Sequence, residues 1–207
     1  MPSILLIRHA VVAPDQQRVC YGDQDVDLSD EGIAASVRLA DGMSGGDQPV
    51  ALYHSDLSRT RMLAERLATR FANATIQGDR RLRERHYGAW QGQPWDDVFD
   101  AHADTFHDLI EKPDTYAPPG GETTSRMQQR MVDWYHDVGQ RHRHQTVIAV
   151  SHSGPIAALA GWCLDLHPTD WQPWTIKNLH GVRIHKDASD SVNVVRIASH
   201  DLHHFFE

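Results

Sequence analysis

Cysteine is scarce in this chain. Among its 207 residues only Cys20 and Cys163 are cysteines, and neither has another cysteine nearby. A CxxC redox pair and a cysteine-ligated zinc site are therefore both excluded. Two free, reduced thiols are typical of a cytoplasmic protein, so we expect a cytoplasmic location.

Positive charge is also in short supply. The 20 Lys and Arg residues are outnumbered by 28 Asp and Glu residues, which gives a formal net charge of -8. Such a surface repels polyanions, so we expect no nucleic-acid partner. No apolar run approaches the ~20 residues needed to cross a bilayer, and the N-terminus lacks a basic segment followed by an apolar one. We therefore expect neither a membrane partner nor a secretory signal.

Histidine, by contrast, is abundant, and its 15 residues raise the question of a metal. His200, His203 and His204 gather near the C-terminus, and His142 and His144 lie close together in the sequence. None of them forms an HExxH pattern, and no cysteine supports a structural zinc site. We interpret these groups as polar surface and expect no metal and no cofactor.

Strand and helix signals alternate along the chain, which favours an α/β fold. Strands are expected at 3–7, 50–53, 74–77 and 146–150, followed by a hairpin at 182–184 and 192–197. Helices are expected after the N-cap Ser29, from near Asp56, along the stripe of Met127, Met131, Trp134 and Val138, and over 156–164. The predicted fold is a three-layer α/β/α sandwich with a mainly parallel central sheet.

The middle of the chain interrupts this alternation. Apolar and aromatic residues at 95, 98, 99, 102, 106 and 109 form an amphipathic stripe, and prolines and glycines between 113 and 121 then mark a loop. No repeat or linker divides the chain. We expect a single domain over 1–207, with a helical insertion at about 89–121 that covers the functional site.

Charged and titratable side chains follow three of the predicted strands. Arg8 and His9 follow the first strand, Arg59 comes shortly after the second, and His152 follows the strand at 146–150. The carboxyl ends of neighbouring parallel strands share one crevice, so we expect these side chains to meet. Guanidinium groups match phosphate oxygens, and imidazole is easily held neutral and nucleophilic near neutral pH. The pattern predicts phosphoryl transfer through a histidine.

With these blocks in order, the chain resembles the histidine phosphatase superfamily, also called the phosphoglycerate mutase-like family. The matching blocks are Arg8-His9-Ala10, the Ser-x-Leu-x-Arg run at 55–59, the segment 82–92 around Glu84, Pro119-Gly120-Gly121-Glu122-Thr123 and Ser151-His152-Ser153-Gly154. The resemblance extends from Ile4 to about Ile156 and implies the phosphoglycerate mutase-like fold.

The resemblance also implies a role for each of these residues. His9 would be the nucleophile that becomes phosphorylated, and Arg8, Arg59 and His152 would bind the phosphoryl oxygens, with His152 counted among the catalytic residues. Glu84 would protonate the leaving oxygen and then activate water. Independent chemistry supports that last role, because an alkoxide is a poor leaving group without a positioned acid. The alternative for Glu84 is a surface ion pair with Arg83 or Arg85.

The chain departs from the family pattern at three positions. Ala10 replaces the usual glycine, and Val11 stands where many relatives carry glutamate. Neither change removes a charged group of the proposed site. Ser153 replaces the common glycine after His152 and adds a hydroxyl near the phosphate, so it joins the candidate phosphate-binding residues, with no role at all as the alternative.

Phosphatases and mutases of the family differ in what accepts the phosphoryl group. A mutase must hold a highly anionic ligand, which calls for basic residues in the covering segment. Between Ala89 and Pro119 this chain has seven acidic residues and a single basic one, Lys112. We expect such a cover to repel phosphoglycerates and therefore predict a metal-independent phosphomonoester hydrolase. Phosphoglycerate mutase stays as the alternative, because Arg85 and Tyr87 match mutase-like positions.

A short pattern narrows the substrate. Residues 20–28 are similar to the Cys-Tyr-Gly-x-x-Asp-Val-x-Leu pattern of α-ribazole phosphatase-like members, and Trp90, Trp95, Phe99 and Phe106 of the cover suit a flat, uncharged base. Among small-molecule phosphate esters, α-ribazole 5′-phosphate is therefore the candidate substrate. The sequence determines neither the natural substrate nor whether the protein forms a homodimer. A non-catalytic phospholigand-binding protein is a second alternative, disfavoured because His9 and Glu84 are both present.

Overall fold

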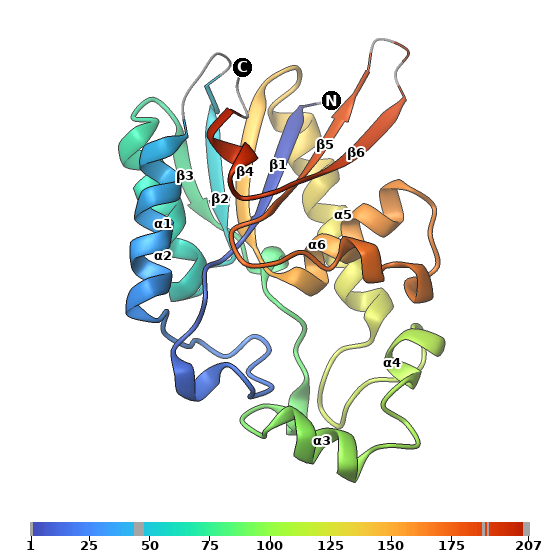
Figure 1. The fold of residues 1–207 in the computed structure, drawn as a ribbon. Helices are drawn as coiled ribbons and strands as arrows, with labels where there is room; N and C mark the ends of the chain where they lie inside the picture. The colour runs from blue at the N-terminus through green and yellow to red at the C-terminus, as the bar shows by residue number, and fades with distance from the viewer. Residues whose placement is uncertain (1, 44–47, 188, 190, 205–207) are drawn as a thin grey trace.

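A six-stranded sheet with the strand order β3-β2-β4-β1-β5-β6 forms the centre of the protein (Figure 1). The structure is a computed structural model that describes residues 2–43, 48–187, 189 and 191–204. The strands are Ser3–Arg8 (β1), Ala51–His54 (β2), Thr75–Gly78 (β3), Thr146–Ser151 (β4), Gly181–Lys186 (β5) and Val192–Ile197 (β6). The first four strands are parallel to one another, and the hairpin of β5 and β6 adds two antiparallel strands beside β1. The predicted mainly parallel sheet is confirmed.

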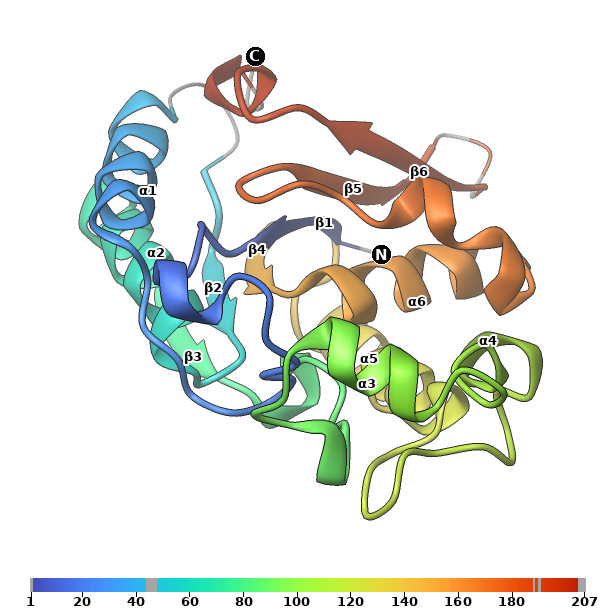
Figure 2. The same ribbon diagram turned by 60° about the horizontal axis from the view of Figure 1, so that its bottom comes forward.

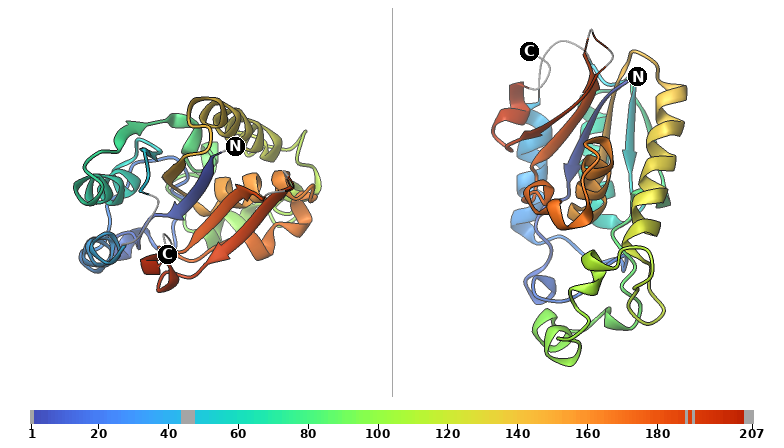
Figure 3. Two further views of the ribbon diagram at one scale, coloured as in Figure 1. Left: turned by 90° about the horizontal axis from the view of Figure 1, so that it is seen from above. Right: turned by 90° about the vertical axis from the view of Figure 1, so that its right-hand side faces the viewer.

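Helices cover both faces of the sheet, as the view from above shows (Figure 3). α1 (Asp30–Gly42) and α2 (Ser58–Arg70) pack on one face, and α5 (Thr124–Arg141) and α6 (Ser153–Cys163) pack on the other. β1 shows why two helical layers are needed. Its Ile4 and Leu6 belong to the core under α5 and α6, whereas Leu5 and Ile7 belong to the core under α1 and α2. A strand that is apolar on both sides must be covered on both sides.

Local signals in the sequence set the helix starts. The Ser29 side chain accepts a hydrogen bond from the Gly32 amide at 3.0 Å, which caps α1 as predicted. The second helix begins at Ser58, two residues later than expected, because Asp56 adopts a left-handed conformation with φ of 64°. Asp56 uses this turn to bind Arg83 through both carboxylate oxygens, at 2.7 and 2.9 Å.

The covering segment lies beyond the carboxyl ends of the parallel strands (Figures 1 and 2). Its helices are short: Gly88–Trp90 is a single 3-10 turn, followed by α3 (Trp95–Ala101) and α4 (Asp108–Glu111). The amphipathic stripe from 95 to 109 is therefore split between two helices and the turns that join them. Trp90, 1% exposed, holds the segment together by stacking on Phe106 at a ring distance of 5.8 Å.

The cover is tied to the loop that follows β1. Val19 and Pro94 form an isolated antiparallel bridge, and the Cys20 amide donates to the Gln93 carbonyl at 2.8 Å. Cys20 and Cys163 are both free thiols. Within the described residues, no helix is long and apolar enough to span a membrane.

Candidate active site

His9 follows β1 directly and is almost completely buried, with 2% of its surface exposed. Its Nδ1 lies 2.7 Å from the carbonyl oxygen of Ala10. A carbonyl oxygen can only accept, so Nδ1 carries the proton and donates it. Nε2 is therefore the nitrogen with a free electron pair. The backbone thus fixes the tautomer that a nucleophilic imidazole requires.

The surroundings of His9 also keep the ring uncharged. Burial lowers the pKa of His9 well below 6.5, and the positive charges of Arg59 and Arg8 lower this pKa further. The hydrogen bond to Ala10 raises the pKa and offsets only part of that shift. The neutral ring is thus the stable form at neutral pH, with its Nε2 pair available for attack.

Arg59 is fully buried at the start of α2. Its two η nitrogens donate to the carbonyl oxygens of Gln24 and Gly22, at 2.6 and 2.7 Å. The guanidinium also lies over the Tyr21 ring, 4.9 Å from its centroid. These contacts fix the plane of the guanidinium, although each η nitrogen carries a second N–H that can serve a ligand. The loop after β1 thus orients an arginine that comes from α2.

His152 follows β4 and stands beside His9, with the two ring centroids 5.0 Å apart. Arg59 Nε donates to His152 Nδ1 at 3.4 Å, so the proton of the neutral ring is on Nε2, which donates to Ser55 Oγ at 2.8 Å. The Ser55 hydroxyl in turn contacts Thr60 Oγ1 at 2.9 Å. Burial, followed by the charge of Arg59, lowers the pKa of His152 well below 6.5.

Arg8, the last residue of β1, provides a second guanidinium whose charge acts on His9. Its Nη1 donates to the carbonyl oxygen of Ile176 at 2.8 Å. Its Nε is buried without a partner among the described residues. An unsatisfied buried donor is costly, and a bound anion would satisfy it.

Glu84 is held by backbone amides. Its carboxylate accepts from the Arg85 amide at 2.9 Å and from the Gly154 amide of α6 at 3.4 Å. The expected alternative, an ion pair with Arg83 or Arg85, is not formed, because Arg83 binds Asp56 and Arg85 binds Thr124. A Cβ atom on Gly154 would lie 2.5 Å from Glu84 Oε1, so a side chain at this position would displace the carboxylate.

A cavity of about 200 Å³ is lined by two of these groups, Arg8 and Glu84, whereas His9, Arg59 and His152 are not among its lining residues. It is lined by Arg8, Gln17, Val19, Tyr21, Gly22, Glu84, Tyr87 and Trp95. Arginine and a carboxyl group therefore face one space with three aromatic rings. This set of groups suits an anionic ester, and no cluster of three metal-ligating side chains occurs in the part of the chain that the structure describes. The side chains of His203 and His204 lie outside that part.

The cover contributes less to the cavity than the sequence suggested. Of the four aromatic residues expected to meet a base, only Trp95 lines the cavity, because Trp90 is buried and Phe99 is 44% exposed. None of the seven acidic residues of the cover lines it either. The expectation that they repel phosphoglycerates from the site is therefore not supported by their positions.

Ser153 is the first residue of α6, and its hydroxyl lies 3.5 Å from the Ile176 carbonyl that also accepts from Arg8. It does not line the cavity. Sequence reasoning missed three supporting residues. The Ser55 hydroxyl accepts from His152, and the Gly154 amide donates to Glu84. The third is Asn178, whose Nδ2 donates to the His9 carbonyl at 2.8 Å. Ser55 and Gly154 lie inside the matched blocks, whereas nothing in the sequence marks Asn178.

Comparisons with known proteins agree with this geometry. A family model described as histidine phosphatase superfamily (branch 1) matches residues 4–198. Phosphoserine phosphatase 1 of Hydrogenobacter thermophilus is 30% identical over 77% of this chain and 74% of its own. Glucosyl-3-phosphoglycerate phosphatase of Mycolicibacterium vanbaalenii is 30% identical over 81% of this chain and 76% of its own. The solved structure of Bacillus stearothermophilus YhfR has a TM-score of 0.83 and 26% identity, and covers 96% of this chain and 97% of its own.

The two buried histidines predict how stability depends on pH. His9 and His152 stay neutral in the fold far below pH 6.5, whereas in the unfolded chain each binds a proton near that pH. The unfolded state then holds more protons, so the free energy of unfolding falls as the pH is lowered from 6.5. At pH 5.5 each histidine should account for about 1 kcal/mol of the loss. Denaturant unfolding at pH 7.5 and 5.5 measures this loss, which His152→Asn should reduce.

The control for this experiment is His144→Asn. His144 is exposed and has a φ of 60°, a conformation that asparagine tolerates. This variant should lose as much stability on acidification as the parent protein. An equal loss in His152→Asn as well would mean that His152 is not kept neutral by burial.

Proposed function

The chain belongs to the histidine phosphatase superfamily (branch 1) and is a phosphatase, and we propose that it hydrolyses small-molecule phosphomonoesters through a phosphohistidine formed on His9. One observation carries the proposal. The hydrogen bond from His9 Nδ1 to the Ala10 carbonyl leaves Nε2 unprotonated in a buried site that is influenced by the charges of two arginines.

In the first step His9 Nε2 attacks phosphorus, and the bond between phosphorus and the ester oxygen breaks. The leaving oxygen takes the proton of the Glu84 carboxyl group as it departs. In the second step the Glu84 carboxylate takes a proton from water, whose oxygen attacks phosphorus while the bond to Nε2 breaks. Inorganic phosphate leaves, and both His9 and Glu84 return to their starting states.

Arg8 and Arg59 would stabilise the charge that spreads over the phosphoryl oxygens in both steps. Two sets of donors support this role: Arg8 Nε, which has no partner among the described residues, and the second N–H group on each η nitrogen of Arg59. Two fixed guanidiniums do what a divalent ion does in other phosphatases, so we propose a metal-independent reaction.

His152 would join the phosphoryl site after giving up one contact. Both of its ring nitrogens now bind protein groups, and the 3.4 Å contact with Arg59 is the longer of the two. A dianionic phosphate nearby favours protonation of Nδ1, which turns that nitrogen from an acceptor into a donor. Ser153, whose hydroxyl points to the Ile176 carbonyl, would contribute through its place in the first turn of α6.

The cavity supports a compact leaving group without a second phosphate. Arg8 is the only lysine or arginine among its lining residues, so nothing there holds the far end of a bisphosphate, and the mutase alternative is disfavoured. Tyr21, Tyr87 and Trp95 offer aromatic faces, which keeps α-ribazole 5′-phosphate as a candidate substrate. The volume of about 200 Å³ and the relatives named as phosphoserine phosphatases favour phosphoserine as the second candidate.

Trapping of the covalent intermediate tests the proposed nucleophile. Wild-type protein mixed with an aryl phosphate and quenched in alkali should carry phosphate that is stable to alkali and labile to acid, with or without EDTA. His9→Ala should carry none, because nothing else at the site is placed to attack. His144→Asn serves as the control and should label fully. Near-normal turnover by His9→Ala, or activity that requires added Mg²⁺ or Zn²⁺, would contradict the mechanism.

Leaving-group dependence tests Glu84. An activated aryl phosphate departs with little protonation, whereas an alkyl phosphate needs an acid, so Glu84→Gln should lower kcat/KM by ~10²–10⁴-fold mainly on alkyl esters. Gly154→Ala should show the same selective loss to a smaller degree, because its new Cβ displaces the carboxylate. Equal losses on both ester types would show that Glu84 is not the acid.

Substrate comparison tests the aromatic lining. We expect α-ribazole 5′-phosphate to be hydrolysed with a higher kcat/KM than 3-phosphoglycerate. Trp95→Ala should lower kcat/KM for the former by about three- to tenfold, since one aromatic contact contributes ~0.5–1.5 kcal/mol. Trp162→Ala, at a 39% exposed residue of α6, is the control. A preference for phosphoserine that Trp95→Ala does not change would favour phosphoserine over α-ribazole 5′-phosphate as the substrate. Efficient interconversion of 2- and 3-phosphoglycerate would instead show that the protein is a phosphoglycerate mutase.

A further inference from the structure

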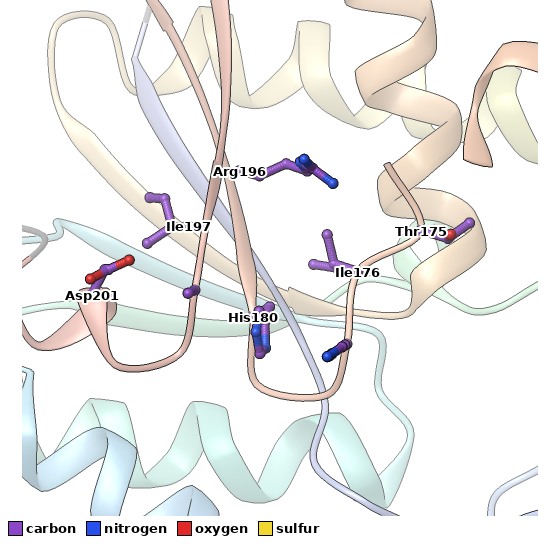
Figure 4. Close-up of a pocket in the computed structure, with 8 residues that line it drawn as sticks. Thr175, Ile176, His180, Arg196, Ile197 and Asp201 are labelled. Carbon is purple, nitrogen blue, oxygen red and sulfur yellow. The ribbon is translucent and has the colours of Figure 1, made fainter. Parts of the chain in front are cut away.

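A second, larger cavity lies between β6 and the chain segment that precedes β5 (Figure 4). It has a volume of about 380 Å³ and is lined by Thr175, Ile176, Lys177, His180, Arg196, Ile197, Ala198 and Asp201. None of these residues lines the cavity beside Arg8 and Glu84. The proposed reaction therefore makes no use of this space.

The lining is basic in a chain whose formal net charge is -8. Lys177 and Arg196 carry fixed positive charges, and among the described residues neither is ion-paired with a carboxylate. The one acidic lining residue, Asp201, lies on the far side of the strands from the Arg196 side chain and contacts His200 at 3.3 Å. The positive charge at the cavity is therefore left for a ligand.

Two of the basic groups are oriented by hydrogen bonds to backbone carbonyls. Arg196 Nη1 donates to the Pro173 carbonyl at 2.7 Å, which orients the guanidinium and leaves its other N–H groups available. His180 Nδ1 lies 3.1 Å from the Asn178 carbonyl, so Nδ1 donates there and Nε2 is free to face the cavity. Ile176 adds apolar surface on the side of Arg196 (Figure 4). The volume lies in the range of ~300–1,000 Å³ typical of small-molecule pockets and exceeds the needs of a phosphate group alone.

The segment 175–180 connects this cavity with the candidate active site. The Ile176 carbonyl accepts from Arg8 Nη1 at 2.8 Å, and Asn178 Nδ2 donates to the His9 carbonyl at 2.8 Å. Backbone hydrogen bonds also join Arg8 to His180 and Leu179, both at 3.0 Å. A ligand that contacts Lys177 and His180 therefore binds the same segment that holds Arg8 and His9.

We propose that this cavity binds a small phosphorylated organic molecule, whose phosphate contacts Arg196, Lys177 and His180, and that its binding alters catalysis through the segment 175–180. The inference goes beyond the proposed function, because it concerns a second ligand site. By linkage, a ligand changes turnover only if it binds more tightly to one arrangement of the segment than to another.

Calorimetric titration tests the site without any turnover. The probe is 3-hydroxypropylphosphonate, whose carbon–phosphorus bond a phosphatase does not cleave, and inorganic phosphate is titrated separately. We expect two probe sites per wild-type chain. The double variant Lys177→Gln/Arg196→Gln should lose about tenfold or more in affinity at one of them, as expected for removal of charged hydrogen bonds. Arg66→Gln, at an exposed arginine of α2 outside the cavity, is the control.

A single probe site in the wild type, or two undiminished sites in the double variant, would overturn the binding proposal. An equal loss of probe affinity in Arg66→Gln would show that the loss reflects the net charge of the protein and not a site in this cavity, and would also overturn the proposal. Binding of inorganic phosphate but not of the phosphonate would contradict the assigned ligand class. These outcomes do not depend on the His9 mechanism, which the trapping of phosphohistidine tests separately.

Steady-state kinetics test the coupling. A probe molecule in the active site competes with the aryl phosphate and changes only KM, whereas one in the second cavity also changes kcat. We expect the probe to change kcat at least twofold in the wild type and in Arg66→Gln, and to become purely competitive in Lys177→Gln/Arg196→Gln. Purely competitive behaviour in all three proteins would show that the cavity is not coupled to catalysis.

Discussion

A neutral imidazole buried close to two guanidinium groups is the constraint on which the rest of this site depends. His9 could not accept a proton there without placing a third positive charge beside Arg8 and Arg59, and burial penalises that charge further. The Ala10 carbonyl accepts a hydrogen bond from Nδ1, which carries the proton of the neutral ring, and the electron pair of Nε2 stays free. In the proposed mechanism, the backbone after β1 thereby prepares the nucleophile without a separate base.

The remaining structure can be understood as support for that arrangement. Arg59 is fully buried, and its charge is held by carbonyl oxygens of the loop after β1 and by the Tyr21 ring rather than by a carboxylate. An acidic partner would reduce the attraction of the guanidinium for a phosphate. Glu84, the one carboxyl group of the cavity, is bound by backbone amides instead. The site thus stays positive although the chain as a whole is acidic.

Much of the fold could be predicted because its signals are local. Apolar strands, the Ser29 cap and the spacing of Met127, Met131, Trp134 and Val138 each identify their element. The convergence of Arg8, His9, Arg59 and His152 followed from parallel strand order. The cover was predicted less well, because its turns and the inward orientation of Trp90 depend on contacts distant in sequence. Asn178 escaped notice for the same reason, since it reaches His9 from 169 residues away.

The central claim of the proposed mechanism is that Nε2 of His9 is the attacking atom, because Nδ1 donates to the Ala10 carbonyl. Phosphorus and nitrogen NMR of the trapped phosphoenzyme, labelled with ¹⁵N in its histidines, tests it most directly. We expect one phosphorylated histidine, His9, with its phosphorus coupled to Nε2 and with Nδ1 still protonated. Coupling of phosphorus to Nδ1, or phosphate on another residue, would contradict the claim.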